Sequence, residues 1–363
     1  MKRKQDMAAV KQRFDAWWRR DLHEGPLICF NTILDSPSEP LEEVKKLEEP
    51  SQLYLDIDWH LARFKNFLRT REFSADSYPS FDINLGPGSL ALYLGSEPIF
   101  AWDTLWYKDV VKNWRDCTLA YNPDNRWWRA HFEMLKKAQD ELGGEGYVNI
   151  PDIIENMDII SAMRGPQPTC FDLMDDYDIV KTRLKELDEL YFKYYDAVYD
   201  LVKDADGGSS YTAFKVMGLG KTAKVQCDFC ALMSPEHFRD LVKPALEYQC
   251  GRLRNSMYHL DGKDCIKHLP ALMEIERLDA LQWTPGSGQP DGADPHWFPI
   301  YDAVADADKS IWVGTYASDA DGVINNVKRL VARYGSKRLY VLLPDYKKDD
   351  AKKILAAIAK GFK

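Results

Sequence analysis

A histidine and an aspartate stand two residues apart in segment 256–262, whose letters are SMYHLDG. Alternate side chains of an extended strand point the same way, so we expect His259 and Asp261 to face one side together. An imidazole beside a carboxylate suits a metal such as zinc, acid–base catalysis, or contact with a substrate. A histidine that is simply satisfied by its neighbours at a strand end is the fourth interpretation, and all four stay open.

A thiol and a second carboxylate close the apolar run 223–229. Cys227 offers a sulfur ligand that would complete a zinc shell with His259 and Asp261. Asp228 offers a carboxylate for acid–base catalysis or for anchoring a substrate. Because neighbouring side chains of a strand point to opposite faces, only one of the pair turns inward while the strand continues.

Four further side chains at the ends of apolar runs are expected to contact a substrate: Asn84, Asp152, Trp283 and Tyr316. The indole of Trp283 would stack on a planar or sugar-like ligand. The alternative for Asp152 is a helix cap, and the alternative for Trp283 is a core residue at the rim of the fold.

Eight short apolar runs alternate with helical segments, and most of them end in Gly, Pro or Asp, as strands do before a turn. The runs are 80–86, 146–152, 210–217, 223–229, 256–262, 280–286, 311–317 and 338–344. This alternation predicts an α/β fold, a (β/α)8 barrel of the TIM type, with an open doubly wound sheet as the rival. In such barrels the reactive groups meet at the carboxyl ends of the strands.

Residues 1–75 read differently from the remainder, with a helix expected over 7–22 and a strand over 26–34. We interpret them as an N-terminal α+β extension that packs on a barrel domain of residues 76–363. A long insertion between the first two barrel strands holds Trp102, Trp106, Trp127 and Trp128. It would cover the mouth as a lid, unless these tryptophans simply pack.

Composition narrows the function classes. The net charge is −9 and basic residues form no extended run, so no nucleic-acid partner is expected. No window has the roughly 18 apolar residues of a membrane span, and the start lacks an apolar signal core, which favours the cytoplasm. The seven cysteines are an odd number, typical of reduced thiols. A small-molecule substrate is expected, and a homodimer is left open.

Several of these segments together resemble the uroporphyrinogen decarboxylase superfamily, loosely from about residue 80 onward. The resemblance rests on Gly86-Pro-Gly-Ser-Leu-Ala-Leu-Tyr-Leu-Gly95, Cys227-Asp-Phe, Ser234-Pro-Glu-His-Phe, Lys243-Pro244, Tyr258-His-Leu-Asp-Gly262 and Leu281-Gln-Trp283. The resemblance implies a TIM-type barrel and is less specific about activity. Its decarboxylase branch carries an arginine-rich N-terminal motif that Arg19 and Arg20 do not match.

The other branch of that superfamily contains corrinoid-linked methyltransferases, which bind zinc through His-x-Cys-Gly and a distant cysteine. His259 matches the family histidine, but Asp261 stands where the first cysteine would be, and 311–317 and 338–344 contain no cysteine. The resemblance therefore implies either zinc held by His259, Asp261 and Cys227, or no zinc at all.

The resulting expectation is an enzyme that transfers a methyl group between a small substrate and a corrinoid or thiol acceptor, with a corrinoid protein as partner. Asp228, His259 and Asp261 would be its catalytic residues. The alternative is a metal-free lyase, decarboxylase or hydrolase that acts on a small polar or sugar-like substrate through Asp152, Asp228 and Asp261. A binding protein without catalysis is the third hypothesis.

Overall fold

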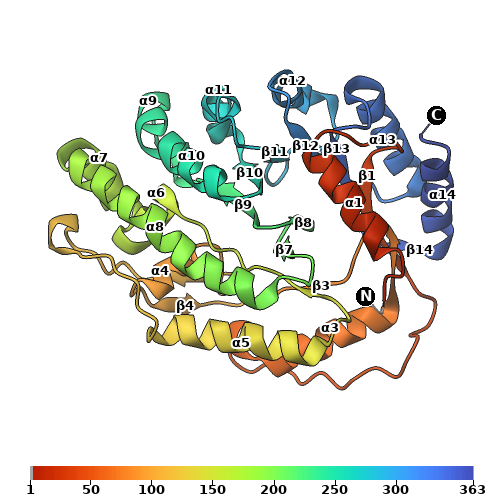
Figure 1. Ribbon diagram of the computed structural model, residues 1–363, viewed down its shortest axis with the longest axis horizontal. Coiled ribbons are helices and arrows are strands. Elements are labelled where there is room, and N and C mark those ends of the chain that lie inside the picture. The colour runs from red at the N-terminus through yellow and green to blue at the C-terminus, as the bar shows by residue number, and fades with distance from the viewer. Residues whose placement is uncertain (1–2, 363) are drawn as a thin grey trace.

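The computed structural model describes residues 3–362, and it is an α/β structure built on a mostly parallel eight-stranded sheet (Figure 1). Seven strands follow the order β14-β1-β13-β12-β11-β10-β9, and β2 pairs antiparallel with β1. Their bounds are β1 (Leu27–Ile33), β2 (Arg71–Ala75), β9 (Thr222–Gln226), β10 (Asn255–Asp261), β11 (Ala280–Thr284), β12 (Ser310–Gly314), β13 (Leu339–Leu342) and β14 (Tyr346–Lys347).

The other strands form three short pairs. β3 (Ser80–Phe81) runs parallel to β6 (Tyr147–Val148), whereas β4 (Pro98–Phe100) with β5 (Leu105–Tyr107) and β7 (Gly208–Tyr211) with β8 (Val216–Leu219) are antiparallel. An isolated bridge from Ile150 to Tyr211 connects the β6 and β7 regions. The α/β class expected from the sequence is confirmed. The eight-stranded sheet itself is open, so closure into a complete barrel stays a prediction.

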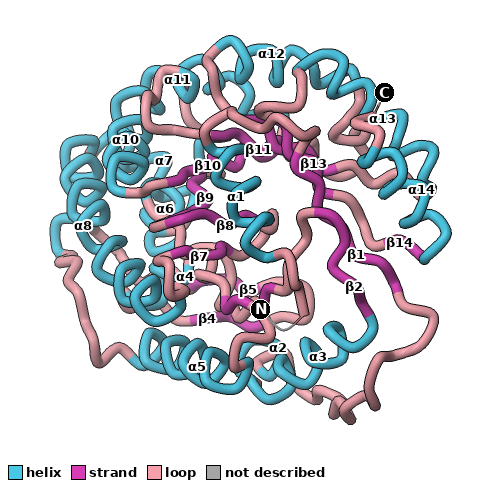
Figure 2. Tube along the Cα trace, turned by 45° about the vertical axis from the view of Figure 1, so that its right-hand side comes forward, coloured by secondary structure: helices cyan, strands magenta, loops and turns pink. Residues whose placement is uncertain are grey.

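Helices surround the strands (Figure 2). They are α1 (Met7–Trp18), α2 (Gln52–Leu55), α3 (Ile57–Thr70), α4 (Ser89–Tyr93), α5 (Arg126–Leu142), α6 (Asn156–Arg164), α7 (Pro166–Asp175), α8 (Tyr177–Val202), α9 (Pro235–His237), α10 (Lys243–Arg252), α11 (Leu269–Met273), α12 (Phe298–Asp306), α13 (Ala320–Tyr334) and α14 (Lys348–Ala359). Among the described helices, none has both the length and the apolar character that a membrane crossing requires.

Helix α1 covers the amino ends of two central strands. The indole of Trp17 donates to the carbonyl of Arg338 over 3.0 Å, and Ser310 donates to the carbonyl of Trp17 over 2.6 Å. Arg338 directly precedes β13 and Ser310 opens β12, so the helix closes this end of the sheet. The opposite end, where the parallel strands finish, is the end at which folds of this kind hold their reactive groups.

Strand β1 lies inside the main sheet, where Leu27 to Cys29 pair in parallel with Tyr340 to Leu342 of β13. The sequence analysis placed this strand in an extension packed on the barrel. The structure shows instead that residues 1–75 contribute a strand to the sheet itself. An isolated apolar strand looks the same in the sequence whether it lies inside a sheet or on it, because its partner is more than 300 residues away.

The run 210–217, expected as one strand, is a hairpin whose tip is Ala213, Phe214 and Lys215. All three have positive φ angles, of 56°, 25° and 47°, which non-glycine residues rarely adopt. Long-range bonds hold this tip: Trp312 donates to the carbonyl of Phe214 over 3.0 Å, and Tyr340 donates to that of Lys215 over 2.8 Å. The turn lacks Gly, Pro or Asn, so local sequence gives no signal for it.

Pro244, which predicts a kink, lies in the first turn of α10, where a missing backbone N–H costs little. The helical path is interrupted just before it, by a π-helical turn over Phe238–Val242. Ser234 caps the preceding turn, accepting from the backbone N of His237 over 3.2 Å.

Two carboxyl groups are buried against each other between α6 and α8. Burial and the charge of Asp188 raise the pKa of Glu155 well above its ordinary value, and burial raises the pKa of Asp188 to about 7. The folded chain therefore keeps protons that the unfolded chain releases above about pH 4. This contribution to stability is fully present below that pH and is lost as pH rises toward 7.

Replacing Asp188 by Asn should weaken this loss. We expect the free energy of unfolding to fall by about 1 kcal/mol less in Asp188→Asn than in wild type when the pH is raised from 5 to 8. This value is reduced because Asp188 is partly exposed. Urea unfolding at both pH values measures it. Asp200→Asn, an exposed acid of the same helix, is the control. The same pH dependence in Asp188→Asn and in wild type would contradict the raised pKa of Asp188.

Candidate functional site

Neighbouring strands place one row of inward side chains level across the sheet. Gln226 of β9 pairs with His259 of β10, which pairs with Gln282 of β11; Trp312 of β12 and Tyr340 of β13 continue the row. Paired residues of parallel strands point to the same face, because the pleats of adjacent strands are in phase. The row therefore forms one layer inside the fold.

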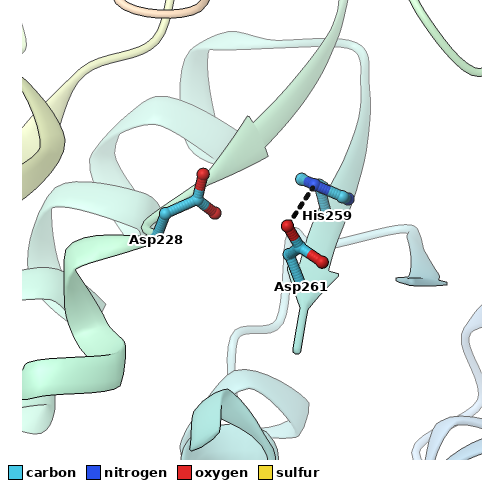
Figure 3. Close-up of side chains that lie close together, drawn as sticks. All are labelled: Asp228, His259 and Asp261. Carbon is cyan, nitrogen blue, oxygen red and sulfur yellow. Dashed lines mark ion pairs between the residues drawn. The ribbon is translucent and has the colours of Figure 1, made fainter. Parts of the chain in front are cut away.

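Two residues further along, toward the carboxyl ends, the chain places Asp228 after Gln226 and Asp261 after His259. Asp228, His259 and Asp261 each offer one ligand atom, and these atoms lie within 4.8 Å of one another (Figure 3). We call these three residues the Asp–His–Asp group. The Nε2 atom of His259 is 4.0 Å from Oδ2 of Asp261, too far for a hydrogen bond. The structure thus brings together the three residues expected to be catalytic.

The protonation of His259 follows from its neighbours. Gln282 donates its amide N–H to Oγ1 of Thr284 over 2.9 Å, which turns its amide oxygen toward Nδ1 of His259. Nδ1 must therefore carry the proton and donate it to Gln282. Burial, and next the positive charge of Lys224, lower the pKa of His259 to about 4. At neutral pH the imidazole is uncharged, and the lone pair of Nε2 is directed toward the group, as in metal-binding histidines.

A buried lysine lies behind the group. Lys224 is 2% exposed, and its Nζ lies 2.7 and 2.9 Å from the two carboxylate oxygens of Asp152. Nζ also donates to Oε1 of Gln226, and Tyr211 donates to Asp152 over 3.1 Å. Because its oxygen is held by Lys224, the amide of Gln226 directs its N–H toward Asp228, 2.9 Å away. The carboxylate of Asp152, which is expected from the sequence to bind a substrate, is thus paired with Lys224.

A further carboxylate, missed in the sequence analysis, faces Asp228. Asp158 lies in the first turn of α6 and accepts from the backbone N–H groups of Asp228, over 3.0 Å, and Phe229, over 2.8 Å. Burial, and next the negative charge of Asp158, raise the pKa of Asp228 to about 7. Burial also raises the pKa of Asp261. Asp228 is therefore suited to take up or release a proton near neutrality.

A cavity of about 400 Å³ opens beside the group. Its walls come from the turn after β3, from β5, from α6 and from the start of the loop after β9, and they are mainly apolar. Asp228 belongs both to these walls and to the Asp–His–Asp group, so a molecule in the cavity reaches the group at Asp228. A small ligand occupies cavities of this size.

Two more residues near this end of the fold, one of them in contact with His259, were not named in the sequence analysis. The ring of Phe214, at the strained hairpin tip, lies 4.9 Å from the imidazole of His259 and 5.2 Å from the indole of Trp312. Asp82, directly after β3, accepts from Asn149 and from Thr212, both over 2.6 Å. Asp82 follows an apolar strand and had a signal in the sequence, whereas Phe214 had none.

The pleat of the strands directs two of the expected site residues away from the Asp–His–Asp group and the cavity. Cys227 is buried on the face opposite to Gln226 and Asp228, and burial raises the pKa of its thiol to about 12. It is therefore a neutral thiol outside the Asp–His–Asp group, which corrects its expected place among the metal ligands. Trp283 is also buried on the helix side, 5.1 Å from Trp297, and does not line the cavity.

Asn84 and Tyr316 also lie apart from the cavity walls. Asn84 follows β3, and its side-chain oxygen is buried. Tyr316 is 71% exposed on the loop after β12, where its backbone N donates to Asp291 over 2.7 Å. Of the four tryptophans expected in a lid, Trp106 lines the cavity, whereas Trp102, Trp127 and Trp128 do not.

One solved structure with this fold is a methyltransferase from Methanosarcina mazei. The two chains superimpose with a TM-score of 0.61 at 12% sequence identity, over 98% of this chain and 99% of that one. No model of a protein family matches the sequence, and no curated protein matches it. At this identity the likeness shows a methyltransferase-like fold.

Removing the buried side chain of Lys224 should strongly destabilise the folded protein. Lys224→Met leaves Asp152 charged and unpaired inside the protein, and we expect it to lower the free energy of unfolding by about 3 kcal/mol or more. Lys221→Met, which removes a more exposed lysine paired with Asp196 in the same part of the chain, should cost less than about 1 kcal/mol. Urea unfolding of both variants measures this difference, and equal losses would contradict it.

Proposed function

We propose that this chain is an enzyme that transfers a methyl group between a small substrate and a corrinoid or thiol acceptor, with the Asp–His–Asp group as its reaction centre. Two observations support the proposal. The fold is methyltransferase-like, and three potential ligand atoms converge within 4.8 Å beside a small cavity. The convergence of these atoms carries the argument, because fold alone does not determine chemistry.

The residues present fit a zinc ion. Zinc accepts nitrogen and carboxylate oxygen as ligands, and His259 presents an uncharged imidazole whose Nε2 lone pair is directed toward Asp261. His259, Asp228 and Asp261 would hold the metal, with Asp261 in place of a family cysteine. When bound, zinc supplies Lewis acidity, which stabilises a thiolate or the charge that develops on a departing atom.

The chain's own residues prepare this centre. Gln282 fixes the tautomer of His259 through Nδ1, and Phe214 covers one face of the imidazole. Gln226, itself held by Lys224, orients the carboxylate of Asp228. These partners fix the orientations of His259 and Asp228, so little reorganisation is needed when a ligand binds.

Several more specific expectations from the sequence are part of the same proposal. They are membership of the uroporphyrinogen decarboxylase superfamily, a complete TIM-type barrel, a corrinoid protein as partner, and a cytoplasmic location. The likeness over nearly the full length of the methyltransferase supports the barrel. Homodimer formation stays open.

A metal-free lyase, decarboxylase or hydrolase is the second candidate, and one observation favours it. The pKa of Asp228 is raised to about 7, while the carboxylate of Asp152 is paired with Lys224. Carboxyl groups in such different environments can divide acid and base roles between them. In this version Asp228 would move the proton, and Asp261 would hold a polar group of the substrate.

Metal analysis tests the first version. The purified chain should bind about one zinc per chain, and His259→Ala and Asp261→Asn should each weaken zinc binding at least about tenfold. Cys227→Ser should bind zinc as wild type does, because Cys227 faces away from the group. Fewer than about 0.2 zinc per chain after incubation with zinc would remove the metal version.

Activity against pH tests the second version. If Asp228 is a general base without a metal, kcat/KM should rise as pH passes about 7, because only the ionised carboxylate accepts a proton. Asp228→Asn should abolish turnover and leave the far-ultraviolet circular dichroism spectrum unchanged. Normal turnover by the folded Asp228→Asn variant would contradict both versions.

A further inference from the structure

The cavity beside the Asp–His–Asp group has aromatic walls that are available to a ligand. Trp106 of β5 is 63% exposed, so its ring is open to contact with a molecule in the cavity. Tyr107 and Phe229 also line the cavity, and the hydroxyl of Tyr107 donates to the carbonyl of Leu85 over 3.0 Å. Aromatic faces carry partial negative charge and attract cations.

All ionisable side chains of the cavity walls other than Tyr107 are acids. Asp109, Asp158 and Asp228 line the cavity, and among the described residues no lysine, arginine or histidine lines it. The nearby buried cation Lys224 is bound to Asp152 and lies outside the walls. Asp228, with a pKa of about 7, is half ionised at neutral pH, and no basic side chain within the walls balances the negative charge of these acids. It opposes an anionic ligand and favours a cationic one.

We propose that this cavity binds a methylated ammonium group carried by a small apolar body. Trp106 would contact the cation through its indole face, and Asp109 would attract it electrostatically from the wall. Asp158 and Asp228 would lie toward the reaction centre. This inference rests on the proposed function insofar as the ammonium compound is the methyl donor. The binding itself does not depend on the transfer.

The charge of such a donor changes during transfer. A thiolate acceptor would attack a methyl carbon, the carbon–nitrogen bond would break, and its electron pair would remain on nitrogen. The products are a thioether and a neutral tertiary amine. A cavity that binds cations selectively holds the cationic donor and binds the neutral product less tightly, which assists product release.

Equilibrium binding separates charge from shape. Calorimetric titration with choline and with 3,3-dimethyl-1-butanol compares ligands that differ chiefly in a quaternary nitrogen replaced by carbon. Choline should bind at least about tenfold more tightly to the wild-type chain. Benzyltrimethylammonium should bind more tightly than choline, because its ring adds apolar contact, and benzenesulfonate should show no saturable binding.

Matched variants locate the effect. Trp106→Leu should weaken benzyltrimethylammonium binding about tenfold, and Trp106→Phe should retain part of the affinity. Trp102→Leu changes an exposed tryptophan of the same hairpin region, 53% exposed, that does not line the cavity, and should bind as wild type does. Asp109→Asn should weaken choline binding but leave 3,3-dimethyl-1-butanol unaffected.

Several outcomes would overturn the inference. Equal affinities for choline and its neutral analogue would show that the cavity does not select ligands by charge. Tighter binding of benzenesulfonate would show that it prefers anions. Equal losses in Trp106→Leu and Trp102→Leu would place the cation elsewhere. Charge-selective binding without methyl transfer supports this inference and removes the proposed function, whereas methyl transfer from a neutral donor without cation binding does the opposite.

Discussion

The ion pair between Lys224 and Asp152 is the constraint on which the site depends. A lysine that is 2% exposed inside a fold is stable only with a partner, and Asp152 provides one at 2.7 Å. Because Lys224 also holds the oxygen of Gln226, the amide nitrogen of that residue is directed toward the carboxylates of Asp228 and Asp158. One buried charge thereby connects the β6 and β9 regions and orients a carboxylate of the site. Burial, and next this charge, lower the pKa of His259.

The strand pleat decides which side chains reach the site. Asp228 and Gln282 point inward, and their sequence neighbours Cys227 and Trp283 point to the helices. A cysteine and an aspartate at one strand end look equally suited to metal binding in the sequence. In the fold they are separated by the thickness of the sheet, and the Asp–His–Asp group is left with nitrogen and oxygen ligands only.

Local sequence patterns predicted the α/β class, the strands β9 to β13 and the position of His259 and Asp261 on one face of a strand. All of these depend on periodicity within a few residues. They did not predict the hairpin tip at Phe214, since Trp312 and Tyr340 impose that turn from a distance. Nor did they predict Asp158, which a helix start after β6 brings to Asp228. The expected substrate contacts at Asn84 and Tyr316 also failed to reach the cavity, because loops after short strands carry their side chains away.

The central claim is that Asp228, His259 and Asp261 form one centre for a metal, and a crystal structure of the zinc-loaded chain tests it most directly. Data collected at the zinc absorption edge should show one strong anomalous peak about 2.0–2.2 Å from Nε2 of His259 and from a carboxylate oxygen of each aspartate. A peak at the Cys227 sulfur instead, or no peak between the three side chains at full zinc loading, would contradict the account.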